Sequence, residues 1–298
     1  MGRTLVFGTS GQVGSALLDL LGDQGIGIDE KTGDFLNPTS LLAALETHRP
    51  AQVINAAAYT AVDLAEKEED KAHLINAVAP GVIAQWCAGH GVPFVHYSTD
   101  YVFEGSGVSA RVESDPTGPL SAYGRTKLQG EKAVSEAQGK YGSKFLIFRT
   151  SWVYDAVGKN FFRTMLRLAK EKSELRIVSD QWGAPTYAPH LAAATLAALS
   201  SACAKPEFPS GVYHLCNQGV TNWFDFAQAI FAAARKRGES LQLEKAIPIT
   251  TADYPTPAKR PLNSRLDLSK ARTWLGVELP SWQAGLEQCC ETFWRTHP

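Results

Sequence analysis

The chain has 298 residues, enough to bury a substantial core as one large domain or two smaller ones. Its 29 basic and 30 acidic residues nearly balance, and the formal net charge of −1 provides no overall positive field for nucleic acid or anionic lipid. The sequence has neither the apolar segment of a secretory signal near its start nor the roughly 18 apolar residues of a membrane span. These features predict a cytoplasmic protein with no nucleic-acid or membrane partner.

The five cysteines are not spaced like metal ligands. None belongs to a C-x-x-C pair, and Cys289 directly precedes Cys290, so we expect no metal site. In a reducing compartment cysteine behaves as a small apolar residue, and we expect these side chains to be buried.

The first half of the chain alternates between strand and helix patterns. Strands are predicted at residues 4–7, 26–29, 51–58, 92–99 and 145–151, and helices at 12–21, 37–48, 62–89 and 122–138. Asn37 is the expected N-cap of the second helix, with Pro38 in its first turn. Strands separated by helices form parallel units with right-handed crossovers. The pattern predicts an α/β fold with a Rossmann-type doubly wound parallel sheet.

The pattern loosens after about residue 150, where prolines become frequent and tryptophans are scattered. We therefore expect a dinucleotide-binding domain at 1–150 and a smaller α/β substrate-binding region at 151–298. Segments near 170–200 and 220–237 could return to the first domain.

Three glycines follow the first strand in "FGTSGQVG". Gly8 would permit a tight turn, Gly11 a close approach to a pyrophosphate, and Gly14 close packing of the helix on the sheet. The N–H groups at the helix start would then face the anion. A structural loop is the alternative, but the position between strand and helix favours a cofactor turn. Asp29, after the second strand, is the candidate for the adenosine ribose, and Asp34 is a second polar candidate.

Tyr123 and Lys127 lie four residues apart, and so on one face of the fourth predicted helix. They follow the strand that ends at Ser98 and Thr99. A nearby ammonium would lower the pKa of the phenol, so that Tyr123 could exchange a proton with a substrate oxygen held by Thr99. The alternative is that Tyr123 and Lys127 are an exposed pair on the helix surface with no catalytic role.

With these residues, the chain resembles the extended short-chain dehydrogenase/reductases. The motifs are "FGTSGQVG", "VINAAAYTAVD", "VHYSTDYVFEG", "PLSAYGRTKLQGE", "FRTSWVY", "DQWGAPT" and "YPTPAKRPLNSRL". The resemblance runs almost from end to end. It implies NADH- or NADPH-dependent reduction of the C4 ketone of a nucleotide sugar, with a catalytic set of Thr99, Tyr123 and Lys127.

The resemblance also implies roles for residues around that set. The cofactor would contact Gly8, Gly11, Gln12, Val13, Gly14, Asp29, Asp34, Phe35, Ala58, Tyr59, Thr60, Tyr123 and Lys127. The nucleotide sugar would contact Thr99, Asp100, Tyr101, Trp152, Arg260, Asn263, Ser264 and Arg265. Guanidinium groups suit a diphosphate, although surface ion pairs could also explain the two arginines. Trp152 could equally be a core residue.

Rival activities share the fold implied here. Dehydratases of this group carry a second carboxylate where this chain has Tyr101, whereas a 4-epimerase is not excluded. A non-catalytic subunit like the β subunit of methionine adenosyltransferase is a rival from another class.

Some reductases of this kind dimerise around a magnesium ion that acidic side chains hold. This chain has Ala16 and Pro189 at the positions aligned with two of these acids, and only Glu291 could match a third. We therefore expect a monomer, or a dimer not bridged by metal.

Overall fold

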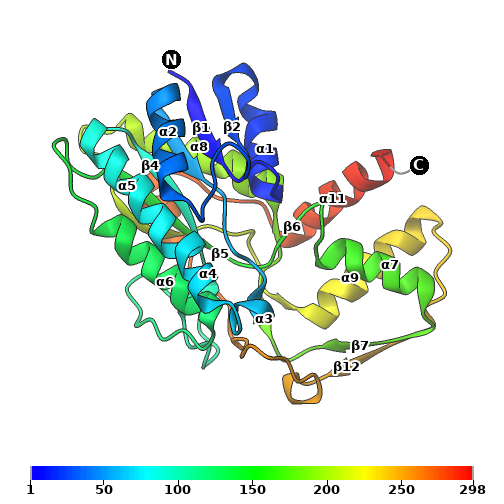
Figure 1. The fold of residues 1–298 in the computed structure, drawn as a ribbon. Helices are drawn as coiled ribbons and strands as arrows, with labels where there is room; N and C mark the ends of the chain where they lie inside the picture. The colour runs from blue at the N-terminus through cyan, green and yellow to red at the C-terminus, as the bar shows by residue number, and fades with distance from the viewer. Residues whose placement is uncertain (1, 297–298) are drawn as a thin grey trace.

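A computed structural model describes residues 2–296. Its centre is a six-stranded sheet in which every neighbouring pair of strands is parallel (Figure 1). The strand order is β10 (Gly211–His214), β5 (Phe145–Thr150), β4 (Phe94–Thr99), β3 (Gln52–Asn55), β1 (Thr4–Phe7) and β2 (Gly25–Ile28). The predicted doubly wound sheet is confirmed, and β10 is an edge strand that the sequence pattern did not reveal.

Helices cover both faces of this sheet. The first face carries α1 (Gln12–Leu21), α8 (Ala188–Cys203) and α10 (Ser269–Leu275), and the second carries α2 (Pro38–His48), α5 (Ala79–His90) and α6 (Ala122–Ser135). Because side chains alternate along a strand, Val6 packs with Leu17 of α1 while Phe7 packs with Leu41 of α2. Asn37 precedes α2 as expected, but its side chain makes no capping hydrogen bond.

The single helix predicted for residues 62–89 is wrong. The segment divides into α3 (Val62–Ala65), α4 (Glu69–His73), a π-helical turn (Leu74–Val78) and α5. Within the π turn, the buried Asn76 side chain accepts from the backbone N–H of Tyr59 at 2.9 Å and donates to its carbonyl at 3.1 Å. These long-range bonds satisfy the loop after β3, a contact that periodicity does not encode.

A smaller lobe lies beside the sheet in Figure 1. It packs α7 (Phe161–Glu171), α9 (Trp223–Arg237) and α11 (Trp282–Thr296) around Phe162, Phe226 and Leu286. Strands β7 (Glu174–Val178) and β12 (Lys245–Ile249) pair beside them. The short pairs are β6 (Val153–Tyr154) with β9 (Thr186–Tyr187) and β8 (Trp182–Gly183) with β11 (Thr221–Asn222).

Later segments of the chain contribute to both lobes. Although they follow residue 150, β10 is the edge strand of the sheet, and α8 and α10 pack against the sheet, whereas α9 packs with α7. The division into a dinucleotide-binding domain at 1–150 and a substrate-binding region at 151–298 therefore stays a prediction.

Short 3₁₀ turns occur at Gly22–Gln24, Asp100–Val102 and Thr251–Asp253. Among residues 2–296, no helix combines the length and apolar character of a transmembrane segment.

Candidate active site

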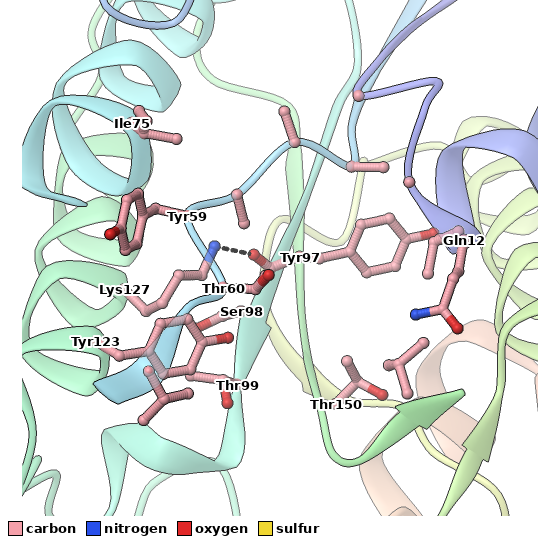
Figure 2. Close-up of a pocket in the computed structure, with 18 of the residues that line it drawn as sticks. Gln12, Tyr59, Thr60, Ile75, Tyr97, Ser98, Thr99, Tyr123, Lys127 and Thr150 are labelled. Atoms are coloured by element: carbon pink, nitrogen blue, oxygen red, sulfur yellow. Dashed lines mark hydrogen bonds between the residues drawn. The ribbon is translucent and has the colours of Figure 1, made fainter. Parts of the chain in front are cut away.

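A cavity of about 780 Å³ opens at the carboxyl ends of the central strands (Figure 2). This is where a doubly wound sheet places its ligands. It brings together most of the residues that the sequence analysis selected. They are Gly8, Gly11, Gln12, Val13, Asp29, Asp34, Phe35, Ala58, Tyr59, Thr60, Thr99, Asp100, Tyr101, Tyr123, Lys127 and Trp152. Gly14, Arg260, Asn263, Ser264 and Arg265 are not among its lining residues.

The turn from β1 into α1 fits a phosphate group. Gly8 has φ +82°, and a Cβ at Gly14 would overlap the Gly8 carbonyl oxygen, which explains glycine at both positions. Gly11 precedes α1 with no side-chain cap, so the first N–H groups of this ten-residue helix stay available to an anion in the cavity. These features would suit the pyrophosphate of a dinucleotide, and Gly14 lies beneath the turn rather than at the cavity wall.

The loop after β2 forms the outer end of the cavity. Asp29 lines it, but its Oδ1 accepts from Thr32 Oγ1 at 2.8 Å and from the backbone N–H groups of Lys31 and Thr32. The Thr32 hydrogen bonds hold the pKa of Asp29 below its usual value. Phe35, which also lines the cavity, is buried with its ring edge-on to Phe7.

The end of β4 places Thr99 and Asp100 at the inner end of the cavity. Thr99 Oγ1 donates to Asp100 Oδ1 at 3.0 Å, and Ser264 supplies a further hydrogen bond to the carboxyl group. Among the described residues, Asp100 Oδ2 has no hydrogen-bond partner although it is buried. Burial raises the pKa of Asp100 to about 6, so this carboxyl group takes up a proton at a higher pH than a surface aspartate does.

Tyr123 projects from the first turn of α6 towards the same point. The turn is capped by Ser121, whose Oγ accepts from the Gly124 N–H at 3.2 Å. The Tyr101 ring lies edge-on to that of Tyr123, with centroids 5.5 Å apart. The expectation that Lys127 lowers the pKa of Tyr123 is wrong for this structure. Burial raises that pKa to about 12, against a smaller lowering by the Thr99 hydrogen bond.

Lys127 lies one turn further along α6, with a side chain only 2% exposed. Its Nζ donates to the Tyr97 carbonyl oxygen at 2.6 Å (Figure 2). The same Nζ lies 3.3 Å from His96 Nε2. Burial lowers the pKa of Lys127 to about 8, against an opposing effect of the Glu131 carboxylate. The lysine is therefore easier to deprotonate than a surface lysine.

Two tryptophans form an apolar wall. Trp152 stacks on Trp223, with ring centroids 3.8 Å apart and planes at 16°. The Trp152 backbone has φ +50°, a left-handed conformation that is rare for a bulky residue and is often found at functional sites. Gly183 gives the ring room, because a Cβ there would lie 3.0 Å from two Trp152 ring atoms. Trp152 thus lines the cavity rather than the core.

Arg260 does not reach the cavity wall. It forms a two-pronged ion pair with Asp63, with Nη1 to Oδ1 at 3.1 Å and Nη2 to Oδ2 at 2.7 Å. The pair ties the segment after β12 to α3 on the other side of the cleft. Arg260 is close enough to Tyr101 for its charge to lower the pKa of that phenol, although burial dominates and raises it.

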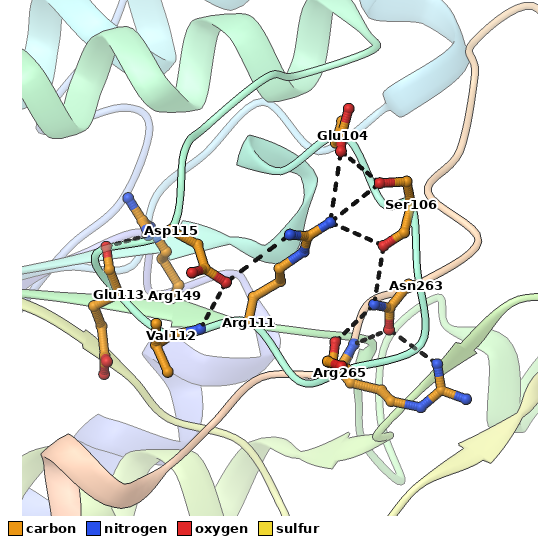
Figure 3. A network of polar contacts seen from close by, with 10 residues as sticks. Glu104, Ser106, Arg111, Val112, Glu113, Asp115, Arg149, Asn263 and Arg265 are labelled. Carbon is orange, nitrogen blue, oxygen red and sulfur yellow. Dashed lines mark hydrogen bonds and ion pairs between the residues drawn. The ribbon is translucent and has the colours of Figure 1, made fainter.

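The other residues of this segment are divided between two environments. Asn263 is buried and donates to the carbonyl oxygens of Ser106 and Ser109 (Figure 3), so its side chain holds the loop after β4. Arg265 bonds Asn263 Oδ1 at 3.0 Å and lines a second cavity of about 250 Å³. The compact donor group expected from the sequence is therefore not assembled around one point.

The sequence analysis missed several residues of the cavity. They include Ser10, Lys71, Ser98, Thr150, Ser151, Lys159, Asn160 and Trp223. Thr150 ends β5 and Ser151 follows it, so both could have been selected by their position at a strand end. Asn160 donates to Gln12 Oε1 at 2.8 Å across 148 residues, and no local pattern predicts this contact.

Among the described residues, no three His, Cys, Asp or Glu side chains are grouped to hold a metal ion. Cys87, Cys216, Cys289 and Cys290 are buried as expected, whereas Cys203 at the end of α8 is exposed.

Comparison with known proteins places the chain in one family. The model described as the RmlD substrate binding domain matches residues 2–295. The dTDP-4-dehydrorhamnose reductase of Escherichia coli K12 is 46% identical over 298 residues, covering 98% of each protein. The reductase of the same name from Burkholderia thailandensis is 45% identical, covering 96% of this chain and 97% of its own.

Solved structures agree. The Bacillus anthracis dTDP-4-dehydrorhamnose reductase in complex with NADP has a TM-score of 0.88 at 33% identity, covering 98% of this chain and 99% of that one. The Clostridium acetobutylicum reductase has a TM-score of 0.89 at the same identity, with the same coverage. The chain belongs to the RmlD substrate-binding-domain family, the family of the dTDP-4-dehydrorhamnose reductases.

Proposed function

We propose that this oxidoreductase uses NADPH or NADH to reduce the C4 ketone of dTDP-4-dehydro-L-rhamnose, giving dTDP-L-rhamnose. The observation that carries the proposal is the position of Thr99, Tyr123 and Lys127 in the same cavity as the uncapped start of α1. One end of the cavity suits a dinucleotide, and the other presents proton donors to a ketone.

Tyr123 acts as the general acid. With a pKa raised to about 12, its phenol stays protonated at neutral pH, which is the form needed to donate to the ketone oxygen. The Thr99 hydroxyl faces the phenol, and its proton, which the structure directs to Asp100 Oδ1, would turn to the ketone oxygen as negative charge develops on it. When bound, the reduced nicotinamide supplies the hydride that forms the new C–H bond at C4. One proton and one hydride convert the ketone to the alcohol.

The surrounding residues would position the two reactants. The α1 N-terminus would hold the pyrophosphate, and Lys127 would bind the nicotinamide ribose. Asp29, Asp34 and Phe35 would lie beside the adenosine, and the Trp152 ring would form the apolar wall beside the hexose. The stacked rings of Trp152 and Trp223 would keep water away from the ketone on this side.

The proposal extends to the setting of the enzyme. We propose that it works in the cytoplasm, without nucleic acid, as a monomer or a dimer that needs no bridging metal. The near-neutral charge of the chain supports the absence of a nucleic-acid partner.

The test follows the absorbance of NADPH or NADH after addition of enzymatically generated ketosugar. Oxidation that depends on both enzyme and sugar is expected, with dTDP-L-rhamnose as the product. Sugar isomerisation without net cofactor loss would identify a 4-epimerase. Absence of turnover, together with copurification of a synthetase, would favour the alternative that the protein is a non-catalytic regulatory subunit.

A further inference from the structure

The segment at residues 180–186, with the sequence DQWGAPT, follows β7 and has no role in the function proposed above. Its backbone holds the part of the chain that carries Trp152. The Ala184 carbonyl oxygen accepts from Ser151 Oγ at 2.9 Å, and the Thr186 N–H donates to the Trp152 carbonyl oxygen at 3.1 Å. The segment is therefore bonded to the chain directly before and after the Trp152 side chain.

The conformation of Trp152 needs such support. Its φ of +50° lies in the left-handed region, which a bulky residue keeps only where its surroundings hold it there. Gly183 leaves room for the ring, because a Cβ there would lie 3.0 Å from Trp152 Cε2 and Cζ2. Trp223 stacks on the ring with a centroid separation of 3.8 Å. The position of the Trp152 ring thus depends on where the Trp223 ring lies.

A hydrogen bond at one edge of Trp223 determines how its ring is turned. Stacking alone is a broad attraction that permits an indole to slide and turn in its own plane. Phe161 contacts Trp223 at a centroid separation of 4.6 Å, and this contact has no polar group either. Trp223 Nε1, however, donates to Gln181 Oε1 at 3.1 Å. Gln181 is only 5% exposed, so this bond is sheltered from water and fixes the indole edge.

The Gln181 amide is itself fixed in orientation. The Trp223 N–H can only donate, so the amide oxygen and not the NH₂ group must face it. The NH₂ group then donates to Thr251 Oγ1 at 3.1 Å. Thr251 Oγ1 in turn donates to Asp180 Oδ1 at 2.6 Å, and its backbone N–H lies 2.9 Å from both Asp180 oxygens. The donors therefore run in one direction, from the indole to the Asp180 carboxylate.

We propose that Gln181 is a positioning residue that holds Trp223 so that the stacked Trp152 ring presents a fixed apolar face to the hexose of the nucleotide sugar. This inference rests on the proposed function, because that function places the hexose beside Trp152. Gln181 is not among the residues that line the catalytic cavity, whereas Trp152 and Trp223 are. Its effect on the sugar therefore passes through Trp223.

The two halves of the substrate separate this role from a general one. The wall contacts the hexose, so loss of Gln181 should weaken binding of dTDP-L-rhamnose, which carries the hexose. Binding of dTDP, which lacks it, should stay the same. General disorder of the cleft would weaken both ligands together.

Gln181→Met keeps the length of the side chain and removes the amide that links Trp223 to Thr251. Titration calorimetry of the full-length protein with NADPH present avoids turnover, because dTDP-L-rhamnose is the reduced sugar. We expect the Kd of dTDP-L-rhamnose to rise about five- to tenfold, while the Kd of dTDP changes by less than about twofold. An unchanged Kd for dTDP-L-rhamnose, or an equal rise for both ligands, would overturn the proposal.

Indole ¹H–¹⁵N NMR reports the geometry of the wall without any ligand. The chain has seven tryptophans, and Trp152→Phe and Trp223→Phe assign the two signals of interest. Ring currents from Trp223 should shift the Trp152 signal, and the hydrogen-bonded Trp223 Nε1–H should exchange slowly with water. In Gln181→Met we expect the Trp152 signal to move and the Trp223 Nε1–H to exchange faster. A Trp152 signal that stays in place would contradict the positioning role.

A double-mutant cycle tests whether Gln181 acts through Trp223. Trp223→Phe keeps an aromatic ring but removes the N–H that Gln181 accepts from. In that background, Gln181→Met should cause no further loss of affinity for dTDP-L-rhamnose, so the double variant should resemble Trp223→Phe alone. Additive losses would overturn the proposal, because Gln181 would then act by another route.

Gln218→Met is the matched control. Gln218 is a half-buried glutamine whose side chain donates to the Leu279 carbonyl oxygen at 2.7 Å, away from the catalytic cavity. Its variant should keep the wild-type affinities and the wild-type Trp152 signal. If Gln181→Met fails to fold, Thr251→Val replaces it with the same expected outcomes, because it removes the hydroxyl that holds the Gln181 amide. If the wild type binds no dTDP-L-rhamnose, the proposed function fails, and the NMR result still decides whether Gln181 orients the tryptophan pair.

Discussion

At the scale of single residues, burial determines which protonation states the site can use. Lys127 and Asp100 are only 2% exposed and Tyr123 is partly buried, and in each case burial shifts the pKa in the direction that favours the uncharged form. Tyr123 and Lys127 could be selected from the sequence by their types and spacing, whereas Asp100 was selected only through the family resemblance. Their environment could not be predicted, because desolvation depends on what the whole chain packs around them.

Tyr123→Phe removes the proposed acid while keeping the ring that packs on Tyr101. We expect turnover to fall by about 10²- to 10⁴-fold, because proton donation is lost. Cofactor affinity, measured by fluorescence titration, should change little. Tyr141→Phe, at a tyrosine that is 56% exposed outside the cavity, serves as the control and should keep full turnover. Wild-type turnover in Tyr123→Phe would exclude the phenol from its role.

Asp100 should make stability depend on pH. Its native pKa of about 6 exceeds the unfolded value of about 4, so the native state holds more protons between these values and stability falls as pH rises through this window. A difference of roughly two in pKa corresponds to about 3 kcal/mol. Asp100→Asn should therefore raise the melting temperature relative to wild type more at pH 8 than at pH 4. The exposed Asp23→Asn should show no such difference, and an equal effect of Asp100→Asn at both pH values would contradict the shift.

At the scale of elements, the site depends on how strands and helices begin and end. The turn into α1 was predictable because its glycines follow a buried strand. The π turn at Asn76 and the left-handed Trp152 were not, since long-range contacts hold them: Asn76 bonds the Tyr59 backbone, and Trp152 stacks on Trp223. Local propensity favours an uninterrupted helix in the first case and disfavours the backbone conformation in the second.

Gly14→Ala tests the packing of this turn. The added Cβ would overlap the Gly8 carbonyl group, which is backbone and cannot move aside cheaply. We expect a loss of about 1–3 kcal/mol of unfolding free energy and weaker NADPH binding. Gly89→Ala in α5 is the matched control, because its Cβ would enter open space. It should be neutral or stabilising by about 0.5–1 kcal/mol. A Gly14→Ala variant with wild-type stability and affinity would show that the turn is not tightly packed.

At the scale of the whole molecule, the site is made where two lobes meet. The sheet lobe supplies the glycine turn, Thr99 and Tyr123, and Trp223 comes from the smaller lobe. The Arg260–Asp63 ion pair joins positions 197 residues apart. Alternation of strands and helices predicted the sheet and its ligand-bearing edge. It could not predict that Arg260 pairs with Asp63, because nothing local in either segment specifies the partner.

Assembly is also tested at this scale. We expect light scattering after size exclusion to give the same mass with and without EDTA, as a monomer or a dimer independent of metal. The expectation rests on the resemblance, which implies bridging acids at the positions of Ala16, buried in the sheet core, and Pro189, at the start of α8. A dimer that dissociates in EDTA would contradict this expectation.

The central claim is that the cavity transfers a hydride to the C4 ketone of the nucleotide sugar. The most direct measurement uses NADPH carrying deuterium at the transferred position and follows the sugar by mass spectrometry and NMR. We predict one deuterium at C4 of dTDP-L-rhamnose for each NADPH oxidised. Cofactor oxidation without deuterium in the sugar, or sugar conversion without net oxidation, would contradict it.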